Sequence, residues 1–217
     1  MKESEFHTTV TRIALGASQG NGFALAGSGA IREHGIISRP SEDIDLFTSD
    51  TNEHRFGEAV DRVTDGLCAD GYDVEVGRRT PQFARMSVRM ANGKQVDIDM
   101  GMDWREMGPV ILGVGAVLSL QDAIGNKVAA LYSRAEARDF FDVDAIRASG
   151  HSTDAQLLAA AAERDPGFDV GVFAIALARV NLLSGDDLKE YGVDAAELDA
   201  IKRRLTDWSV TLRSAQH

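Results

Sequence analysis

The sequence predicts an α+β fold in two parts, a lobe of mixed sheet with helices over residues 1–118 and an all-helical lobe over residues 119–217. Short apolar runs and alternating apolar and polar side chains, which are typical of strands, occur only in the first part. The second part is rich in alanine and repeats its apolar side chains at helical spacing. No proline-rich or serine-rich linker marks the boundary, so its position follows from the change of pattern alone.

Each predicted element has a local reason. Apolar side chains three and four positions apart predict helices over residues 4–17 and 52–69. Five further segments are apolar or alternate in polarity, which predicts strands over residues 22–27, 43–47, 72–76, 83–90 and 95–100. In the second part, helical spacing and N-terminal capping residues predict helices over residues 119–134, 138–148, 153–163, 169–183 and 194–213.

The last two strands are predicted to form a hairpin that turns at Gly93. A two-residue loop would place arginines on the same face as the apolar side chains of the partner strand. A three-residue loop that ends with Gly93 in a left-handed conformation separates the polar face from the apolar one. We therefore expect the three-residue loop, which places Arg85 opposite Asp99 and Ser87 opposite Asp97.

Composition restricts the classes of function. The 217 residues include 23 Lys and Arg against 34 Asp and Glu, a formal net charge of −11. This charge argues against a protein that coats nucleic acid or membrane with a general positive field, although it leaves room for a local basic site.

The longest apolar run, residues 110–120, is shorter than the roughly 20 residues of a membrane span. The first ten residues also lack a signal-peptide pattern, so we expect a cytoplasmic protein with no membrane partner. The single cysteine, Cys68, excludes an internal disulfide and is expected to be buried.

Two groups of acidic residues carry the candidate chemistry. Asp43 and Asp45 alternate along one predicted strand, so both carboxylates point to the same side. A third carboxylate on another strand, Asp97 or Asp99, could complete a site for divalent cations. Such cations bind a triphosphate and stabilise the leaving group of an in-line displacement. The same acids are also consistent with a solvated strand face.

Phosphate-binding features lie near these acids. Gly27-Ser28 forms a small turn before a helix and leaves backbone N–H groups available to a phosphate. Arg85 belongs to a basic run without acidic residues between residues 76 and 96. This run could bind triphosphate or an RNA backbone, or it could be a solvated face.

Together these motifs resemble a known signature. A Gly-Ser pair followed by an Asp-x-Asp strand is similar to the signature of the DNA polymerase β-like nucleotidyltransferases. The segment RPSEDIDL, residues 39–46, resembles more narrowly the AbiEii/AbiGii toxin nucleotidyltransferases, a group that includes MenT-like toxins. Lys127, followed by an Arg-Asp-x-x-Asp pattern over residues 138–142, resembles the C-terminal motif of that family. The resemblance covers residues 22–146.

The resemblance implies a polymerase β-like nucleotidyltransferase lobe and metal-dependent transfer of a nucleotide from an NTP. Asp43 and Asp45 would be ligands of Mg²⁺, with two ions expected. For the third ligand, relatives often show Asp-hydrophobic-Gly-x-Asp-x-Arg, which the chain matches from Asp99 onward. This match favours Asp99 and leaves Asp97 as the alternate ligand.

The resemblance also implies binding roles. Gly27 and Ser28 would hold the triphosphate, Lys127 would reach the phosphates, and Asp139 would order or balance the basic groups nearby. Lys127 could also be a solvated helix lysine, and Asp139 could form a purely structural ion pair with Arg138.

Ser41 precedes the first proposed metal ligand by two residues and is counted among the nucleotide-binding residues. We hypothesise that its phosphorylation silences the enzyme, because a phosphate there would compete for metal and repel the NTP.

The sequence thus predicts a cytoplasmic Mg²⁺-dependent nucleotidyltransferase that is the toxin of a toxin–antitoxin pair. As the resemblance implies, the acceptor would be RNA, with the tRNA 3′ end as the first to test, and the modification would block translation. The partners would be an NTP, a tRNA and a cognate antitoxin. Two alternatives stay open: transfer to a protein hydroxyl or an aminoglycoside-like small molecule, for which the negative net charge is favourable, and an inactive nucleotide-binding or partner-binding module.

Overall fold

The chain folds into two compact units. A computed structural model describes residues 3–39, 41 and 43–215. The first unit falls within residues 1–34 and 40–120, and the second within residues 35–39 and 121–217. A short segment that precedes the acidic strand therefore belongs to the second unit. The division at residues 118 and 119 stays a prediction.

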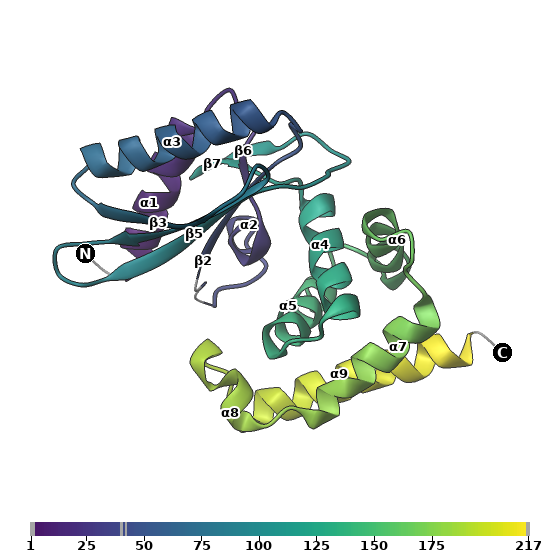
Figure 1. The fold of residues 1–217 in the computed structure, drawn as a ribbon. Coiled ribbons are helices and arrows are strands. Elements are labelled where there is room, and N and C mark those ends of the chain that lie inside the picture. Colours follow the sequence, from purple (N-terminus) through teal and green to yellow (C-terminus); the bar gives the residue numbers. More distant parts are fainter. Residues whose placement is uncertain (1–2, 40, 42, 216–217) are drawn as a thin grey trace. The chain divides into compact units, whose positions relative to one another are not determined.

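In the first unit, the described strands form one seven-stranded mixed sheet in the order β3-β4-β5-β2-β1-β7-β6. Its helices and strands are α1 (Glu3–Ala17), β1 (Ala24–Leu25), α2 (Gly27–Glu33), β2 (Asp43–Thr48), α3 (Glu53–Ala69), β3 (Asp73–Arg79), β4 (Phe83–Arg89), β5 (Gln95–Met102), β6 (Val110–Leu112) and β7 (Gly115–Val117). Helices α1 and α3 pack against each other along the sheet (Figure 1). This architecture confirms the predicted fold class.

Alternation along β2 decides which face of the sheet carries the acids. Ile44 and Leu46 are fully buried, whereas Asp43 and Asp45, which alternate with them, are only half-buried. Successive side chains of a strand point to opposite faces, so the apolar residues enter the core and the carboxylates line the other face. The predicted segregation of the acids on one face is confirmed.

The hairpin register is confirmed in full. Arg85 pairs with Asp99 and Ser87 with Asp97 across β4 and β5. The backbone N–H of Met90 donates to the carbonyl oxygen of Lys94 at 2.8 Å, which closes a loop of three residues. Gly93 in this loop has a φ of 85°, a left-handed conformation that glycine adopts without steric cost.

Helix α3 shows why the prediction for Cys68 was wrong. The Oδ1 atom of Asn52 accepts a hydrogen bond from the Arg55 backbone N–H and caps the helix. Helical spacing then gives one buried stripe, which consists of Phe56, Ala59, Val60, Val63 and Leu67. Cys68 follows the last residue of this stripe by one position, a rotation of about 100°, and is therefore exposed.

Some predicted elements differ from those in the structure. The strand expected over residues 22–27 is reduced to β1, because α2 already begins at Gly27. The Gly27-Ser28 turn that was expected before a helix is therefore the first turn of α2 itself. Strands β6 and β7 were missed, since each has three residues and too little alternation to be recognised. The helix expected over residues 169–183 ends earlier and continues as a short 3₁₀ turn.

The described secondary structure of the second unit consists of helices alone. Its elements are α4 (Leu120–Ser133), α5 (Ala137–Ala148), α6 (Asp154–Arg164), α7 (Val170–Ala178), η1 (Arg179–Leu182), α8 (Gly185–Leu188), η2 (Lys189–Tyr191) and α9 (Ala195–Ser214). The core between α7 and α9 contains Phe173 and Trp208, whose rings pack edge to face with their centroids 5.3 Å apart. Such an arrangement is one of the favoured geometries of aromatic pairs.

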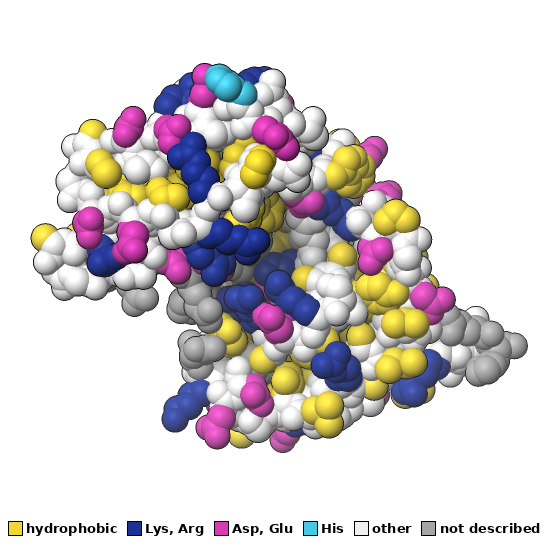
Figure 2. Space-filling model, viewed as in Figure 1, with side chains coloured by type: hydrophobic (Ala, Val, Ile, Leu, Met, Phe, Trp, Pro, Cys, Tyr) yellow, Lys and Arg dark blue, Asp and Glu magenta, His cyan; other side chains and the backbone are white. Residues whose placement is uncertain are grey.

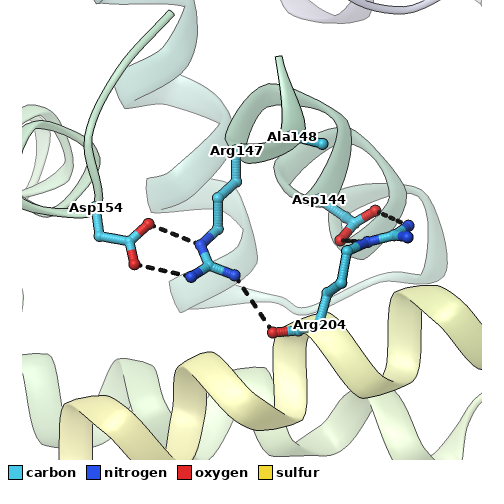
Figure 3. Close-up of a pocket in the computed structure, with 5 residues that line it drawn as sticks. All are labelled: Asp144, Arg147, Ala148, Asp154 and Arg204. Carbon is cyan, nitrogen blue, oxygen red and sulfur yellow. Dashed lines mark hydrogen bonds and ion pairs between the residues drawn. The ribbon is translucent and has the colours of Figure 1, made fainter. Parts of the chain in front are cut away.

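Bidentate ion pairs connect three helices of this unit. Figure 3 shows Arg204 of α9 paired with Asp144 of α5, and Arg147 of α5 paired with Asp154 of α6. The guanidinium of Arg147 also lies over the ring of Trp208 at 4.8 Å. Each charged group in this open pocket has an opposite charge as its partner, so the pocket is explained as part of the helix packing. Among the described residues, no helix is both long and apolar enough to cross a membrane.

Candidate active site

Two neighbouring strands bring three carboxylates together. Strands β2 and β5 pair in parallel, with Asp43 beside Asp97 and Asp45 beside Asp99. Carboxylate oxygens of Asp43, Asp45 and Asp99 all lie within 4.8 Å of one another. Three hard oxygen ligands at this spacing fit a divalent cation such as Mg²⁺, which carboxylates bind in proteins. The donor set therefore fits the metal that the sequence predicts.

Asp97 has a different environment from Asp99. Its Oδ1 atom accepts hydrogen bonds from the Ser87 hydroxyl at 2.6 Å and from the Gln95 amide at 3.3 Å. In the part of the chain that the structure describes, the three-carboxylate group does not include it. The geometry thus favours Asp99 over Asp97 as the third ligand.

The turn at Gly27 approaches the acids closely. A Cβ atom at Gly27 would lie 1.8 Å from Oδ2 of Asp45, and the φ of Gly27 is +55°. Both the space and the backbone conformation therefore require glycine. The adjacent Ser28 hydroxyl is 2.6 Å from the hydroxyl of Ser41, which in turn donates to the Asp43 carbonyl oxygen at 2.9 Å. The structure thus brings Gly27, Ser28 and Ser41 to the acidic strand.

Arg85 contributes a cation to the same group. Its Nε donates to Oδ1 of Asp99 at 2.6 Å, and its Nη2 forms a second hydrogen bond to Oδ2 of Asp99. These hydrogen bonds and the Asp99 charge raise the pKa of Arg85, with smaller contributions from Asp97 and Asp43. The guanidinium is therefore a permanent cation at the edge of the carboxylates.

Other members of the basic run have local partners. Arg79 pairs with Asp61, and Arg89 pairs with Glu75 on the neighbouring strand. Acidic and basic side chains are mixed over the face of the first unit that Figure 2 shows. This part of the run therefore resembles a solvated face more than a phosphate-binding surface.

The other two predicted site residues lie in the second unit. Lys127 of α4 is buried, and its Nζ lies 2.7 Å from Oδ2 of Asp142 on α5. Arg39 donates to both oxygens of the same carboxylate, from Nε at 2.7 Å and from Nη2 at 2.6 Å. Burial alone would raise the pKa of Asp142, but the hydrogen bonds of Arg39 and the charge of Lys127 outweigh this effect and lower it.

Asp139 has a separate partner. It is fully buried, accepts two hydrogen bonds from Arg134 and accepts a third from the Glu136 backbone N–H. Arg138 pairs with Glu136, so the alternative in which Asp139 pairs with Arg138 does not hold for these side chains. Asp139 orders a neighbouring basic group, although the group is Arg134.

Sequence reasoning gave no role to three residues that hold these groups. Asp142 binds both Lys127 and Arg39, and Nε2 of His7 makes a 3.1 Å hydrogen bond with the Asp43 carbonyl oxygen. Arg39 and Asp142 both lie in the segments that carry the family resemblance, which is the signal that could have identified them. His7 has no comparable signal in the sequence.

A mixed sheet that presents three clustered carboxylates beside Gly27 and Ser28 is the arrangement that the resemblance to nucleotidyltransferases predicts. The sequence matches the family described as nucleotidyl transferase AbiEii toxin, type IV toxin–antitoxin system, over residues 13–207. The chain therefore belongs to the AbiEii family, and it is a toxin nucleotidyltransferase. Membership implies a nucleotide substrate and an antitoxin partner.

Solved structures share the fold at low sequence identity. JHP933 from Helicobacter pylori is 17% identical with a TM-score of 0.58, and the match covers 100% of this chain and 99% of that one. MenT4, a nucleotidyltransferase toxin from Mycobacterium tuberculosis, is 16% identical with a TM-score of 0.59, over 94% of this chain and 82% of that one. No protein of curated function matches the sequence significantly.

Proposed function

We propose that this toxin transfers a nucleotide from an NTP to an RNA acceptor in a Mg²⁺-dependent reaction in the cytoplasm. The tRNA 3′ end is the proposed acceptor, and its modification would block translation. The observation that carries the metal-dependent chemistry is the cluster of Asp43, Asp45 and Asp99 carboxylates within 4.8 Å. Membership in a family of toxin nucleotidyltransferases supports an acceptor whose modification harms the cell.

In this proposal Asp43, Asp45 and Asp99 hold the Mg²⁺ ions. When bound, the ions supply charge neutralisation for the triphosphate and for the pyrophosphate leaving group. Gly27 keeps the turn close to Asp45, because any side chain would displace that carboxylate. The hydroxyl pair of Ser28 and Ser41 fixes the turn to the start of β2 and offers hydrogen-bond partners to phosphate oxygens.

We assign Lys127 to the phosphates and Asp142 to the orientation of its amine. Lysine side chains are flexible, and the contact with Asp142 restricts Nζ to one position. Arg39 prevents this carboxylate from moving, since it engages both of its oxygens. Asp139 acts through another residue, as the partner that orders Arg134.

The experiment is an incorporation assay with each of the four α-labelled NTPs and Mg²⁺. Acceptors are purified tRNA, total RNA, total protein and an aminoglycoside, so the alternative acceptors are tested in parallel. We expect label at the 3′ end of tRNA, and its removal by chelation of the metal. Label on protein or aminoglycoside alone would refute the RNA acceptor but keep the chemistry.

Variants connect the activity to the site. Asp43→Asn and Asp99→Asn should abolish transfer while both proteins keep the wild-type circular dichroism spectrum. Asp97→Asn should keep most of the activity, because its carboxylate lies with Ser87 and Gln95. Full incorporation by Asp43→Asn would refute the proposed mechanism.

A further inference from the structure

The carboxylate of Asp99 belongs to two groups at once. It is one of the three carboxylates that could share a cation, and it is also the forked partner of Arg85. Both of its oxygens accept hydrogen bonds from the guanidinium. A metal cation and the Arg85 guanidinium would therefore both lie beside the Asp99 carboxylate. At this short separation the two positive charges repel each other.

The charges of the site make this repulsion depend on what is bound. Three carboxylates and one arginine leave a net charge of −2, which a single divalent cation cancels. A second divalent cation would give the site a net positive charge as long as no nucleotide is bound, and Arg85 contributes to this positive charge. The triphosphate of a nucleotide is strongly negative, so its arrival removes the obstacle to full loading with metal.

Arg85 can form contacts with phosphate and Asp99 in turn. Its side chain is 51% exposed, whereas that of Asp99 is 11% exposed, so the guanidinium lies at the solvent side of the pair. A guanidinium has five N–H donors, and Asp99 uses two of them. The planar fork that engages a carboxylate also matches a phosphate.

Resting on the proposed function, we infer that Arg85 couples metal binding to nucleotide binding. Without nucleotide, Arg85 holds Asp99 and weakens the binding of divalent cations. With nucleotide, the guanidinium interacts with the triphosphate, and the carboxylates bind metal more tightly. Because coupling free energies are reciprocal, metal strengthens nucleotide binding by the same factor.

The test measures a complete binding cycle without catalysis. Mn²⁺ is the metal probe, with free ion followed by electron paramagnetic resonance, and the nucleotide probes are α,β-methylene NTPs, which cannot transfer a nucleotide. The dissociation constant of Mn²⁺ is measured with and without nucleotide for the wild type and for Arg85→Gln. Arg89→Gln is the matched control, because Arg89 lies on the same strand face and pairs with Glu75 rather than with the cluster.

In the absence of nucleotide, we expect Arg85→Gln to bind Mn²⁺ about tenfold more tightly than the wild type does. The factor by which nucleotide increases the Mn²⁺ affinity should be about tenfold smaller in this variant, a change within the range usual for coupled sites. Arg89→Gln should behave as the wild type does. Unchanged or weaker Mn²⁺ binding by Arg85→Gln, or an unchanged coupling factor, would overturn the role of Arg85 and leave the proposed function standing. If the wild type binds neither Mn²⁺ nor any of the nucleotides, the proposed function fails and the inference fails with it.

Discussion

Replacement of Gly27 by alanine tests how the turn and the acids depend on each other. The new Cβ would lie 1.8 Å from Oδ2 of Asp45, where real contacts do not fall below 3.0 Å. The Asp45 carboxylate must therefore retreat by about 1 Å, and displacements of this size at a reacting centre cost on the order of 10²-fold in rate. The positive φ adds about 1–2 kcal/mol of strain for a residue with a side chain.

Gly93→Ala separates the two effects. Gly93 has a φ of +85°, but among the described residues beyond its chain neighbours no atom lies within 4 Å of the position that a Cβ would take. This variant therefore carries the backbone strain without the collision. Urea unfolding should show a loss of about 1–2 kcal/mol for Gly93→Ala and at least that loss for Gly27→Ala. Mn²⁺ affinity and NTP incorporation should fall only for Gly27→Ala. Wild-type metal binding and activity in Gly27→Ala would refute the reasoning that the turn positions Asp45.

Three further changes test other parts of the molecule. Asp142→Asn should cost about 3 kcal/mol in urea unfolding, because it removes the buried carboxylate that Arg39 and Lys127 share. Because the pKa of Asp142 is lowered in the folded state, its carboxylate stabilises the fold at pH values above the unfolded-state pKa of about 3.9. This stabilisation is lost as the pH falls through the folded-state pKa, so stability should fall less steeply with acid in Asp142→Asn than in the wild type. The same pH profile for both proteins would contradict this role of Asp142. Gly125→Ala should destabilise the protein by about 1 kcal/mol despite the better helix propensity of alanine, because its Cβ would lie 2.8 Å from the Ala160 carbonyl oxygen. Gly57→Ala should stabilise it, because that Cβ would make only an ordinary 3.5 Å contact with Nη2 of Arg79. Equal effects of the two variants in thermal unfolding would refute the collision at Gly125. Ser41→Glu should abolish NTP incorporation if a negative charge beside Ser28 repels the triphosphate, and full activity would count against the phosphorylation hypothesis.

Local chemistry was sufficient for the hairpin and the acidic strand. The polar and apolar faces of β4 and β5 separate in one register only, because a slip by one residue turns every side chain to the other face. The same period of two placed Asp43 and Asp45 on one side of β2. These features depend on neighbours in the sequence, and the structure has them as predicted.

Short strands and the packing of helices were harder to predict from the sequence. Strands of three residues, such as β6 and β7, have too few positions to show a period. The exposure of Cys68 depends on which face of α3 meets α1 and the sheet, and a helical pattern alone does not exclude a cysteine at the margin of the apolar stripe.

The sequence by itself determined the class of fold and the acidic strand, because the period of a strand operates over a few residues. The motif match favoured Asp99 over Asp97, but only the tertiary structure brought Asp99 to Asp43 and Asp45, since the parallel pairing of β2 with β5 joins segments about fifty residues apart. Only the tertiary structure joined Arg39 to Asp142, 103 positions later in the chain. Such pairings depend on the path of the whole backbone, because burial and hydrogen bonding select partners by their position in space.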